Sequence, residues 1–231
     1  CDAVELLGLD ALPWTDGLRQ FRERVSCLRD WSPELGLPDV SDESLLLSRE
    51  RWLKPALAGK TRLDALSESE LGDALRSQLD WPQRQALDQL APTRITVPSG
   101  MERAITYQHG ATPVLAVKLQ ELFGLADTPR IAGGKVPLTI HLLSPARRPV
   151  QVTRDLASFW AKGYKAVKAE LKGRYPRHYW PDDPAIAEPT ARVRPRPGGS
   201  VGEARPGRAG DGLGLPAPLP RPSAGDRNGP R

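Results

Sequence analysis

The stretch RITVPSGMERAITY, residues 94–107, marks the point at which the apolar pattern of this chain changes from helical spacing to alternation. Ile95 and Val97 alternate with polar residues, and Ile105 and Tyr107 do so again after an intervening Pro-Ser-Gly. Alternation is typical of half-buried strands, and Pro-Ser-Gly is typical of a turn. The stretch therefore predicts two strands joined by a turn, and it separates a helical part of the chain from a part that contains a sheet.

Residues 1–91, which precede this stretch, follow the period of amphipathic helices. Ser67 and Glu70 occupy the positions of a capping box, and Asp80 with Pro82 is typical of the first turn of a helix. The connections are short, so neighbouring helices are expected to pack side by side as an N-terminal helical bundle. The residues expected on buried helix faces are Leu18, Phe21, Val25, Leu28, Leu46, Trp52 and Leu53.

Residues 92–189 predict a small domain of the α+β class. Thr112 is suited to cap a helix, Pro113 to occupy its first turn and Gly124 to close it, so a helix is expected over 112–124. Alternation in VPLTIHLL and the short segment VQV predict two further strands. The resulting order of strand, strand, helix, strand, strand and a final long helix is typical of a small mixed β-sheet with packed helices.

The final helix is predicted from VTRDLASFWAKGYKAVKAELKGRYPRHYWPDDP, residues 152–184. At 100° per residue it is amphipathic, with an apolar stripe that is expected to pack on the sheet and a basic stripe on another side. The basic stripe predicts either a solvated face or a surface that contacts phosphate groups. The apolar stripe is Leu156, Trp160, Tyr164, Val167 and Leu171, and the basic stripe is Lys162, Lys165, Lys168 and Lys172.

Further candidates for nucleic-acid contact flank the lysines of this helix. Arginines are expected to contact phosphates, and aromatic residues next to arginines are able to stack on bases. The same aromatic residues are equally suited to form an apolar plug that holds the end of the chain against the body. These flanking candidates are Arg147, Arg148, Arg154, Arg174, Tyr175, Arg177, Tyr179 and Trp180.

The net charge of +5 is distributed unevenly along the 231 residues. Residues 1–90 carry a net charge of −6, whereas residues 147–178 carry +7. Such a chain is able to bind a polyanion, or to pair its own acidic and basic parts. Residues 190–231 hold eight prolines and nine glycines and carry +5, so we expect a disordered tail that serves as a linker or adds weak affinity for RNA.

Motifs for catalysis and metal binding are not found. Gly59-Lys60-Thr61 resembles the end of a phosphate-binding loop, but Lys54 stands where the first glycine of that loop is needed. The three histidines are far apart and lack metal-ligand spacing, and no nucleophile elbow is found. The sequence therefore predicts neither a catalytic residue nor a metal site, and the chain alone is not expected to hydrolyse ATP.

Cysteine usage and hydropathy indicate the compartment. Cys1 and Cys27 do not form a disulfide framework, and Cys27 is expected to be a buried free thiol in a reducing cytoplasm. No apolar run approaches the ~20 residues that span a bilayer, and the first residues do not resemble a signal peptide. We expect a cytoplasmic chain with no membrane partner, and the missing initial methionine leaves open a fragment or a processed product.

Several long blocks carry a family resemblance that covers about residues 1–190: LDWPQRQALDQLAPTRITVPSG (79–100), PVLAVKLQELFGL (113–125), RIAGGKVPLTIHLLSPARRPVQVTRDLASFW (130–160) and LKGRYPRHYWPDDP (171–184). With DALPWTDGLRQFRERV (10–25) and LPDVSDESLLL (37–47), they resemble the C-terminal region of the HrpB family of bacterial DEAH-box ATP-dependent RNA helicases. The resemblance implies a parent enzyme that couples ATP hydrolysis to movement on RNA or DNA.

The resemblance also implies which parts of that enzyme this sequence lacks. ATP and magnesium would belong to two RecA-like motor domains before Cys1, and no cofactor or catalytic residue of the family is carried over to this chain. The oligonucleotide-binding barrel of such helicases is expected upstream as well.

The sequence leaves two hypotheses for function. In the first, this accessory region binds RNA or another single-stranded nucleic acid, or supports the helicase core in cis. In the alternative, it is a protein–protein interaction or structural docking module without direct nucleic-acid contact, and its acidic helices pair with its basic segment.

Overall fold

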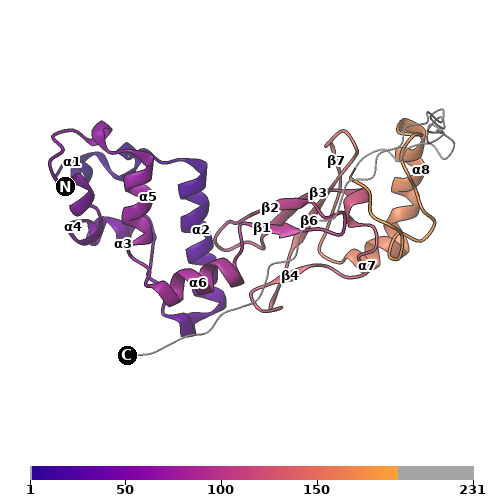
Figure 1. Ribbon diagram of the computed structural model, residues 1–231, viewed down its shortest axis with the longest axis horizontal. Helices are drawn as coiled ribbons and strands as arrows, with labels where there is room; N and C mark the ends of the chain where they lie inside the picture. Colours follow the sequence, from indigo (N-terminus) through magenta and orange to yellow (C-terminus); the bar gives the residue numbers. More distant parts are fainter. Residues whose placement is uncertain (1, 192–231) are drawn as a thin grey trace, which may run out of the picture. The chain divides into compact units, whose positions relative to one another are not determined.

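The computed structural model describes residues 2–191. Its first part is helical, as predicted, because apolar residues recur at helical spacing and polar residues cap the helix ends. Figure 1 shows these helices in indigo to magenta. They are α1 (Asp2–Leu7), α2 (Asp16–Trp31), α3 (Asp42–Leu47), α4 (Arg49–Trp52), α5 (Glu68–Arg76) and α6 (Trp81–Leu90), with 3₁₀ turns at Leu9–Ala11, Pro33–Leu35, Pro55–Leu57 and Leu63–Ala65.

Two capping boxes determine where α5 and α6 begin. The Ser67 hydroxyl accepts a hydrogen bond from the Glu70 backbone N–H, and the Glu70 carboxylate accepts one from the Ser67 backbone N–H. Asp80 and Gln83 form the same reciprocal pair at α6. Each box satisfies two backbone N–H groups that have no partner within the helix, so the predicted starts of both helices are confirmed.

A five-stranded mixed sheet comes after the helices, with the strand order β1-β2-β3-β6-β7. β3 and β6 are parallel, so their carboxyl ends lie at the same edge, and the other neighbouring pairs are antiparallel. Figure 1 shows β1, β2, β3 and β6 side by side, and the α+β class is confirmed. The strands are β1 (Arg94–Thr96), β2 (Glu102–Thr106), β3 (Val114–Lys118), β6 (Thr139–Leu143) and β7 (Pro149–Thr153), while β4 (Arg130–Ile131) and β5 (Val136–Pro137) form a separate pair.

The helix predicted over residues 112–124 is wrong. This segment forms strand β3, and only Leu119–Leu122 after it winds into a 3₁₀ turn. Leu115 and Val117 are buried while Ala116 between them is exposed, which is the alternation of a strand. Cap-like residues at the two ends gave a local helix signal, and pairing with strands on both sides outweighs it.

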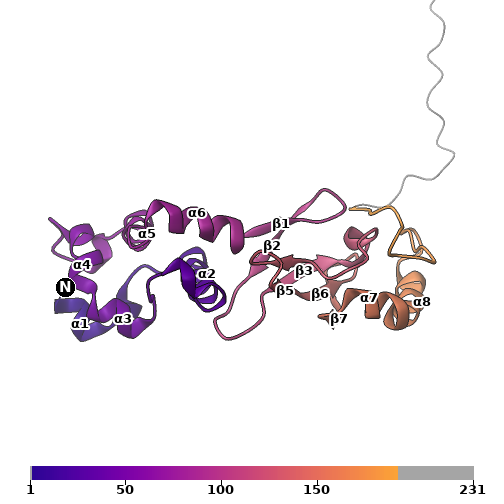
Figure 2. The same ribbon diagram turned by 90° about the horizontal axis from the view of Figure 1, so that it is seen from below.

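The predicted final helix is present, but it is not a continuous α-helix. α7 (Leu156–Ser158) and α8 (Tyr164–Arg174) are separated by a π-helical turn, Phe159–Gly163. Figure 2 shows α7 leading from the sheet into α8. Because a π-helical turn is wider than an α-helical one, the step of 100° per residue is interrupted at Lys162, which lies inside that turn.

The apolar stripe predicted for this helix is confirmed. Trp160 and Tyr164 pack on Phe123, in the segment after β3, with ring centroids 6.2 and 6.1 Å apart. The Trp160 indole N–H also donates to the Leu125 carbonyl at 2.7 Å. Leu156 and Leu171 are buried as well, and Val167 is partly buried against the same core.

One apolar core connects the helices to the sheet. Val25 and Leu28 of α2 belong to the same cluster as Leu115 and the rest of the sheet interior. The Gln20 side chain reinforces this connection because it both donates to the Tyr107 carbonyl and accepts from the Tyr107 N–H. A second cluster lies within the first helices, and the boundary expected at residues 91 and 92 stays a prediction.

Other expectations concern single residues and the chain end. Cys27 is a free, buried cysteine, and burial raises the pKa of its thiol to about 11.

Between residues 2 and 191, no helix is long and apolar enough to cross a membrane. The predicted disordered tail, residues 190–231, falls almost entirely outside the described residues.

Candidate nucleic-acid interface

Three strand ends bring three basic side chains to one edge of the sheet. Arg103 is near the start of β2, Lys118 ends β3, and Arg147 lies in the turn after β6. β2 is antiparallel to β3, and β6 is parallel to it, so the start of β2 and the ends of β3 and β6 meet at one edge. The three side chains line a cavity of about 170 Å³, which we call the basic hollow.

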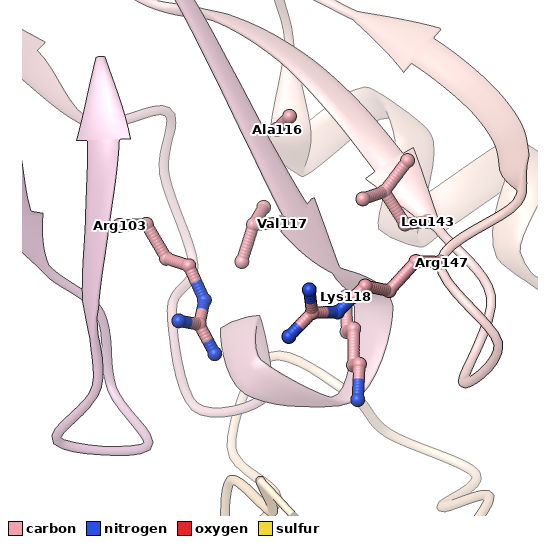
Figure 3. A pocket seen from close by; sticks show the side chains of 6 residues that line it. All are labelled: Arg103, Ala116, Val117, Lys118, Leu143 and Arg147. Atoms are coloured by element: carbon pink, nitrogen blue, oxygen red, sulfur yellow. The ribbon is translucent and has the colours of Figure 1, made fainter.

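Figure 3 shows how the side chains of the basic hollow lie. Arg103 and Arg147 extend toward one another from opposite sides of Val117 of β3, and Lys118 lies beside Arg147. Ala116 and Leu143 complete the lining and contribute no charge. The hollow therefore combines an apolar floor with cationic walls, an arrangement that attracts anions.

A buried carboxylate holds Arg103 in position. The Arg103 guanidinium donates to both carboxylate oxygens of Glu121, at 2.6 and 2.7 Å, and the Glu121 side chain is only 1% exposed. Hydrogen bonds from that guanidinium to the carboxylate raise the pKa of Arg103. Bidentate pairing fixes the plane of the guanidinium, so one face of the hollow is rigid before any ligand arrives.

The turn that carries Arg147 is tightly hydrogen bonded. The Arg147 N–H donates to the Ser144 carbonyl at 2.8 Å, and the Ser144 N–H donates to the Arg148 carbonyl at 2.8 Å. The buried Ser144 hydroxyl in turn accepts from the Arg148 N–H. Arg147 and Arg148 are both exposed, but only Arg147 lines the basic hollow.

His178, which follows α8, lies near Lys118. His178 lies close enough that the Lys118 charge, together with the larger effect of burial, lowers the pKa of the imidazole. The His178 ring packs edge-on against Tyr175, with centroids 6.0 Å apart. The His178 imidazole is therefore within electrostatic reach of Lys118.

The four lysines of the predicted basic stripe have different surroundings. Lys168 donates to the Pro181 carbonyl and pairs with Asp182, and its side chain is 18% exposed. Lys162, Lys165 and Lys172 are exposed, and no ion pair with another residue of 2–191 involves them. The structure thus assigns Lys168 to holding the segment at Pro181 and Asp182, and leaves three lysines facing solvent.

Arg154 lies apart from the other predicted arginines. It comes directly after the last residue of β7, whereas Arg147 and Arg148 precede the first. Its guanidinium donates to the Thr112 hydroxyl at 2.8 Å and to the Thr139 hydroxyl at 3.3 Å. Although Arg154 is exposed, these bonds give it a structural task at the opposite edge of the sheet from the basic hollow.

The aromatic residues Tyr175, Tyr179 and Trp180 were predicted either to stack on bases or to form an apolar plug, and their packing favours the plug for two of them. Trp180 is only 9% exposed, and its indole N–H donates to the Tyr175 carbonyl. The Tyr179 ring lies edge-on to Phe123 at 6.3 Å. These contacts favour the apolar plug for Trp180 and Tyr179, while Tyr175 is partly exposed and Arg174 and Arg177 are exposed beside it.

Arg103, Lys118 and Glu121 were missed from the sequence. They were missed because residues 112–124 were interpreted as a helix, which gave no reason to place Lys118 beside Arg147 or Glu121 beside Arg103. The available signal was alternation in VLAVK, which is a strand pattern as well as an apolar run.

Metal binding is not indicated in the part of the chain that the structure covers. Within residues 2–191, no group of three or more His, Cys, Asp or Glu residues is placed to hold a metal ion.

Comparisons with known proteins give consistent results. A family model described as "ATP-dependent helicase C-terminal" matches residues 52–184. The chain is 49% identical over 187 residues to the ATP-dependent RNA helicase HrpB of Escherichia coli strain K12, an alignment that covers 81% of this chain and 23% of that protein.

Two solved structures are also similar. One is described as the E. coli DExH-box NTPase HrpB, with a TM-score of 0.79 and 48% identity over 83% of this chain and 24% of that one. The other is described as the Escherichia coli DEAH/RHA helicase HrpB, with a TM-score of 0.67 and 45% identity over 78% of this chain and 23% of that one. The chain thus spans about a quarter of the length of these relatives.

Proposed function

Because this chain belongs to the HrpB family of ATP-dependent helicases, as part of their C-terminal region, we propose that it binds a single strand of RNA beside the helicase core. One observation chiefly supports this proposal. Lys162 in the π-helical turn and Lys165 and Lys172 in α8 are exposed and remain outside the ion pairs that residues 2–191 form among themselves. Cations that the fold does not neutralise are available to phosphate groups.

RNA is the preferred ligand within this proposal. The E. coli relative is named an ATP-dependent RNA helicase. Exposed lysines contact phosphates without reading bases, so we expect binding with little sequence preference. We expect the strand to run from α8 toward Arg147 and Arg148, which are exposed cations of the same basic segment.

The remaining activities of the enzyme would belong to other parts of it. We assign ATP and magnesium binding to the helicase core in cis, and expect this chain alone to leave ATP intact. The proposal includes a cytoplasmic location, which suits the free thiol of Cys27.

A charge-reversal variant tests the proposal. In the full chain, Lys162, Lys165 and Lys172 would be changed together to glutamate, and binding of a fluorescently labelled single-stranded RNA would be measured by anisotropy. Lys168 is left in place because it holds Pro181 and Asp182. We expect RNA affinity to fall by about tenfold or more, since three phosphate contacts become repulsive.

A matched control separates a local effect from a change in overall charge. Arg19, Arg51 and Arg62 are exposed in the helical part, and changing all three to glutamate alters the net charge equally. The control is expected to retain most of the affinity. If both variants fold by circular dichroism and bind RNA as the unaltered chain does, the proposed role of the lysines is wrong.

A docking role is the second candidate, and exposed apolar side chains favour it. Trp81 at the start of α6 is 68% exposed, and Leu47 at the end of α3 is 77% exposed. Exposed large aromatic residues are enriched at protein interfaces. Changing Trp81 to serine would weaken association with a separately expressed helicase core if this surface docks on it, without altering RNA binding.

A further inference from the structure

We infer that the basic hollow binds one phosphate group of the RNA strand, with Arg147, Lys118 and Arg103 as its donors. The inference rests on the proposed function and adds a defined site to it. Arg103 and Lys118 do not belong to the set of exposed lysines, Lys162, Lys165 and Lys172, so the site is distinct from that set.

Arg103 retains donors for a ligand after its structural bonds are made. A guanidinium has five N–H groups. Two of them bind Glu121, and a third binds the Glu102 carbonyl at 3.1 Å. Two N–H groups therefore remain, on a guanidinium whose side chain is 23% exposed and whose plane is fixed by Glu121.

The backbone at Arg147 supports a functional reason for this arginine. Its φ is 61°, the left-handed region in which glycine is preferred because a Cβ crowds the neighbouring carbonyl. Tight turns between antiparallel strands usually have glycine or asparagine at such positions. An arginine at this position strains the backbone and therefore lowers the stability of the fold. Its guanidinium points into the basic hollow.

Strand geometry next to the turn also directs Arg147. The pairing of β6 with β7 shifts register between Leu142 and Leu143, immediately before the turn. An irregularity of this kind bends a strand and re-aims the side chains beyond it, and it is common next to binding sites. Both features act on the same turn and place its arginine across from Arg103.

Size and charge select the ligand. A volume of about 170 Å³ corresponds to roughly six waters at ~30 Å³ each, which suits one phosphate group better than a whole nucleotide. Three cations face one buried carboxylate, so the hollow keeps a net charge of about +2. A phosphodiester would satisfy the free donors and neutralise part of this charge.

Arg147→Gly in the full chain is the most informative test. Glycine suits the left-handed backbone at this position, so the variant should melt at the same temperature as the unaltered chain or higher. Its affinity for single-stranded RNA should nevertheless fall by about tenfold, because a charge-assisted contact is lost. The slope of log affinity against log salt should become shallower by about 0.7, the value for one phosphate on a single strand.

The control is Arg62→Gln, which removes one exposed cation from the helical part and should change neither quantity. Equal RNA binding by Arg147→Gly and the unaltered chain would overturn the inference and leave the proposed function intact. No RNA binding by the unaltered chain would overturn both. Tighter binding of a phosphoserine peptide than of RNA would replace the nucleic acid by a phosphorylated protein, and would also overturn the inference.

A second readout uses the imidazole beside the hollow. The Lys118 charge contributes to the lowered pKa of His178. A phosphate bound at Lys118 would offset that charge, so saturation with RNA should raise the His178 pKa in an NMR titration of the unaltered chain. The rise should be smaller in Arg147→Gly, and a His178 pKa that RNA leaves unchanged would contradict binding at this site.

Discussion

At the scale of single residues, two glycines of the last helix test how tightly its π-helical turn is packed. A Cβ on Gly163 would lie 2.8 Å from the Phe159 ring, which is buried, whereas a Cβ on Gly173 would meet nothing within 4 Å. We expect Gly163→Ala to lower the free energy of unfolding by about 1–3 kcal/mol through overpacking. Gly173→Ala should raise it by up to about 1 kcal/mol, because alanine favours helix. Urea denaturation of both variants measures the contrast, and equal effects would contradict this packing.

Arg24 tests the connection between α2 and α6. Its side chain is 8% exposed and donates to the Ala91 carbonyl at 2.7 Å, to the Leu87 carbonyl and to Asp88, at the carboxyl end of α6. Arg24→Met should lower the free energy of unfolding by about 2–4 kcal/mol, since it leaves buried carbonyls without donors. Arg19→Met, on the exposed side of the same helix, should change it by less than about 0.5 kcal/mol. If the two variants unfold at the same urea concentration, Arg24 does not have this structural role.

At the scale of elements, the capping box of α5 predicts a pH dependence of stability. The Ser67 backbone N–H, followed by Lys60, holds the pKa of the Glu70 carboxyl at about 2, below its ordinary value of 4.5. A carboxyl whose pKa is lower in the folded chain stabilises the fold above its ordinary pKa. This contribution is lost as the pH falls from 4.5 toward 2.

Comparison with Glu70→Gln isolates this contribution. Glutamine preserves the capping box but carries no charge. The melting temperature of the unaltered chain should exceed that of the variant at about pH 7, and the difference should shrink as the pH falls toward 2. A difference that stays constant over that range would show that the Glu70 charge does not stabilise α5.

The elements that could be predicted from the sequence are those whose signals are local. Ser67 and Asp80 cap helices through bonds to residues three positions away, so their pattern is visible in a short window. Strand β3 was harder to recognise, because its short alternation competes with cap-like residues at both ends. The pairing that decides it is with β2 and, more than twenty residues further along the chain, with β6. The basic hollow depends on that pairing, and therefore only Arg147 of its three cations was predicted.

The lysine stripe shows a related difference. A helical wheel places Lys168 with Lys165 and Lys172, but it contains no information on the residues beyond the end of the helix. The chain returns after α8, and the Pro181 carbonyl and Asp182 take up Lys168. Periodicity thus grouped these lysines and could not show which of their charges the fold uses.

At the scale of the whole molecule, the uneven charge is not cancelled by pairing between its acidic and basic parts. Among residues 2–191, the basic segment 147–178 forms its ion pairs with Asp182 and Glu170, which belong to the same part of the chain. The acidic helices pair instead within themselves or with Lys135 and His109. The positive charge of the segment thus remains available to an external polyanion, as the proposed function requires.

The salt dependence of RNA binding tests this central claim most directly. Anisotropy titrations of a single-stranded RNA would be repeated between about 50 and 200 mM salt with the full chain and with the Lys162, Lys165 and Lys172 triple glutamate variant. We predict that log affinity falls linearly with log salt, and that the slope of the variant is shallower by about 2, or ~0.7 for each of three phosphates. The difference between the two chains removes any contribution of residues 192–231, which are common to both. Identical slopes, or no binding by the unaltered chain, would contradict the account.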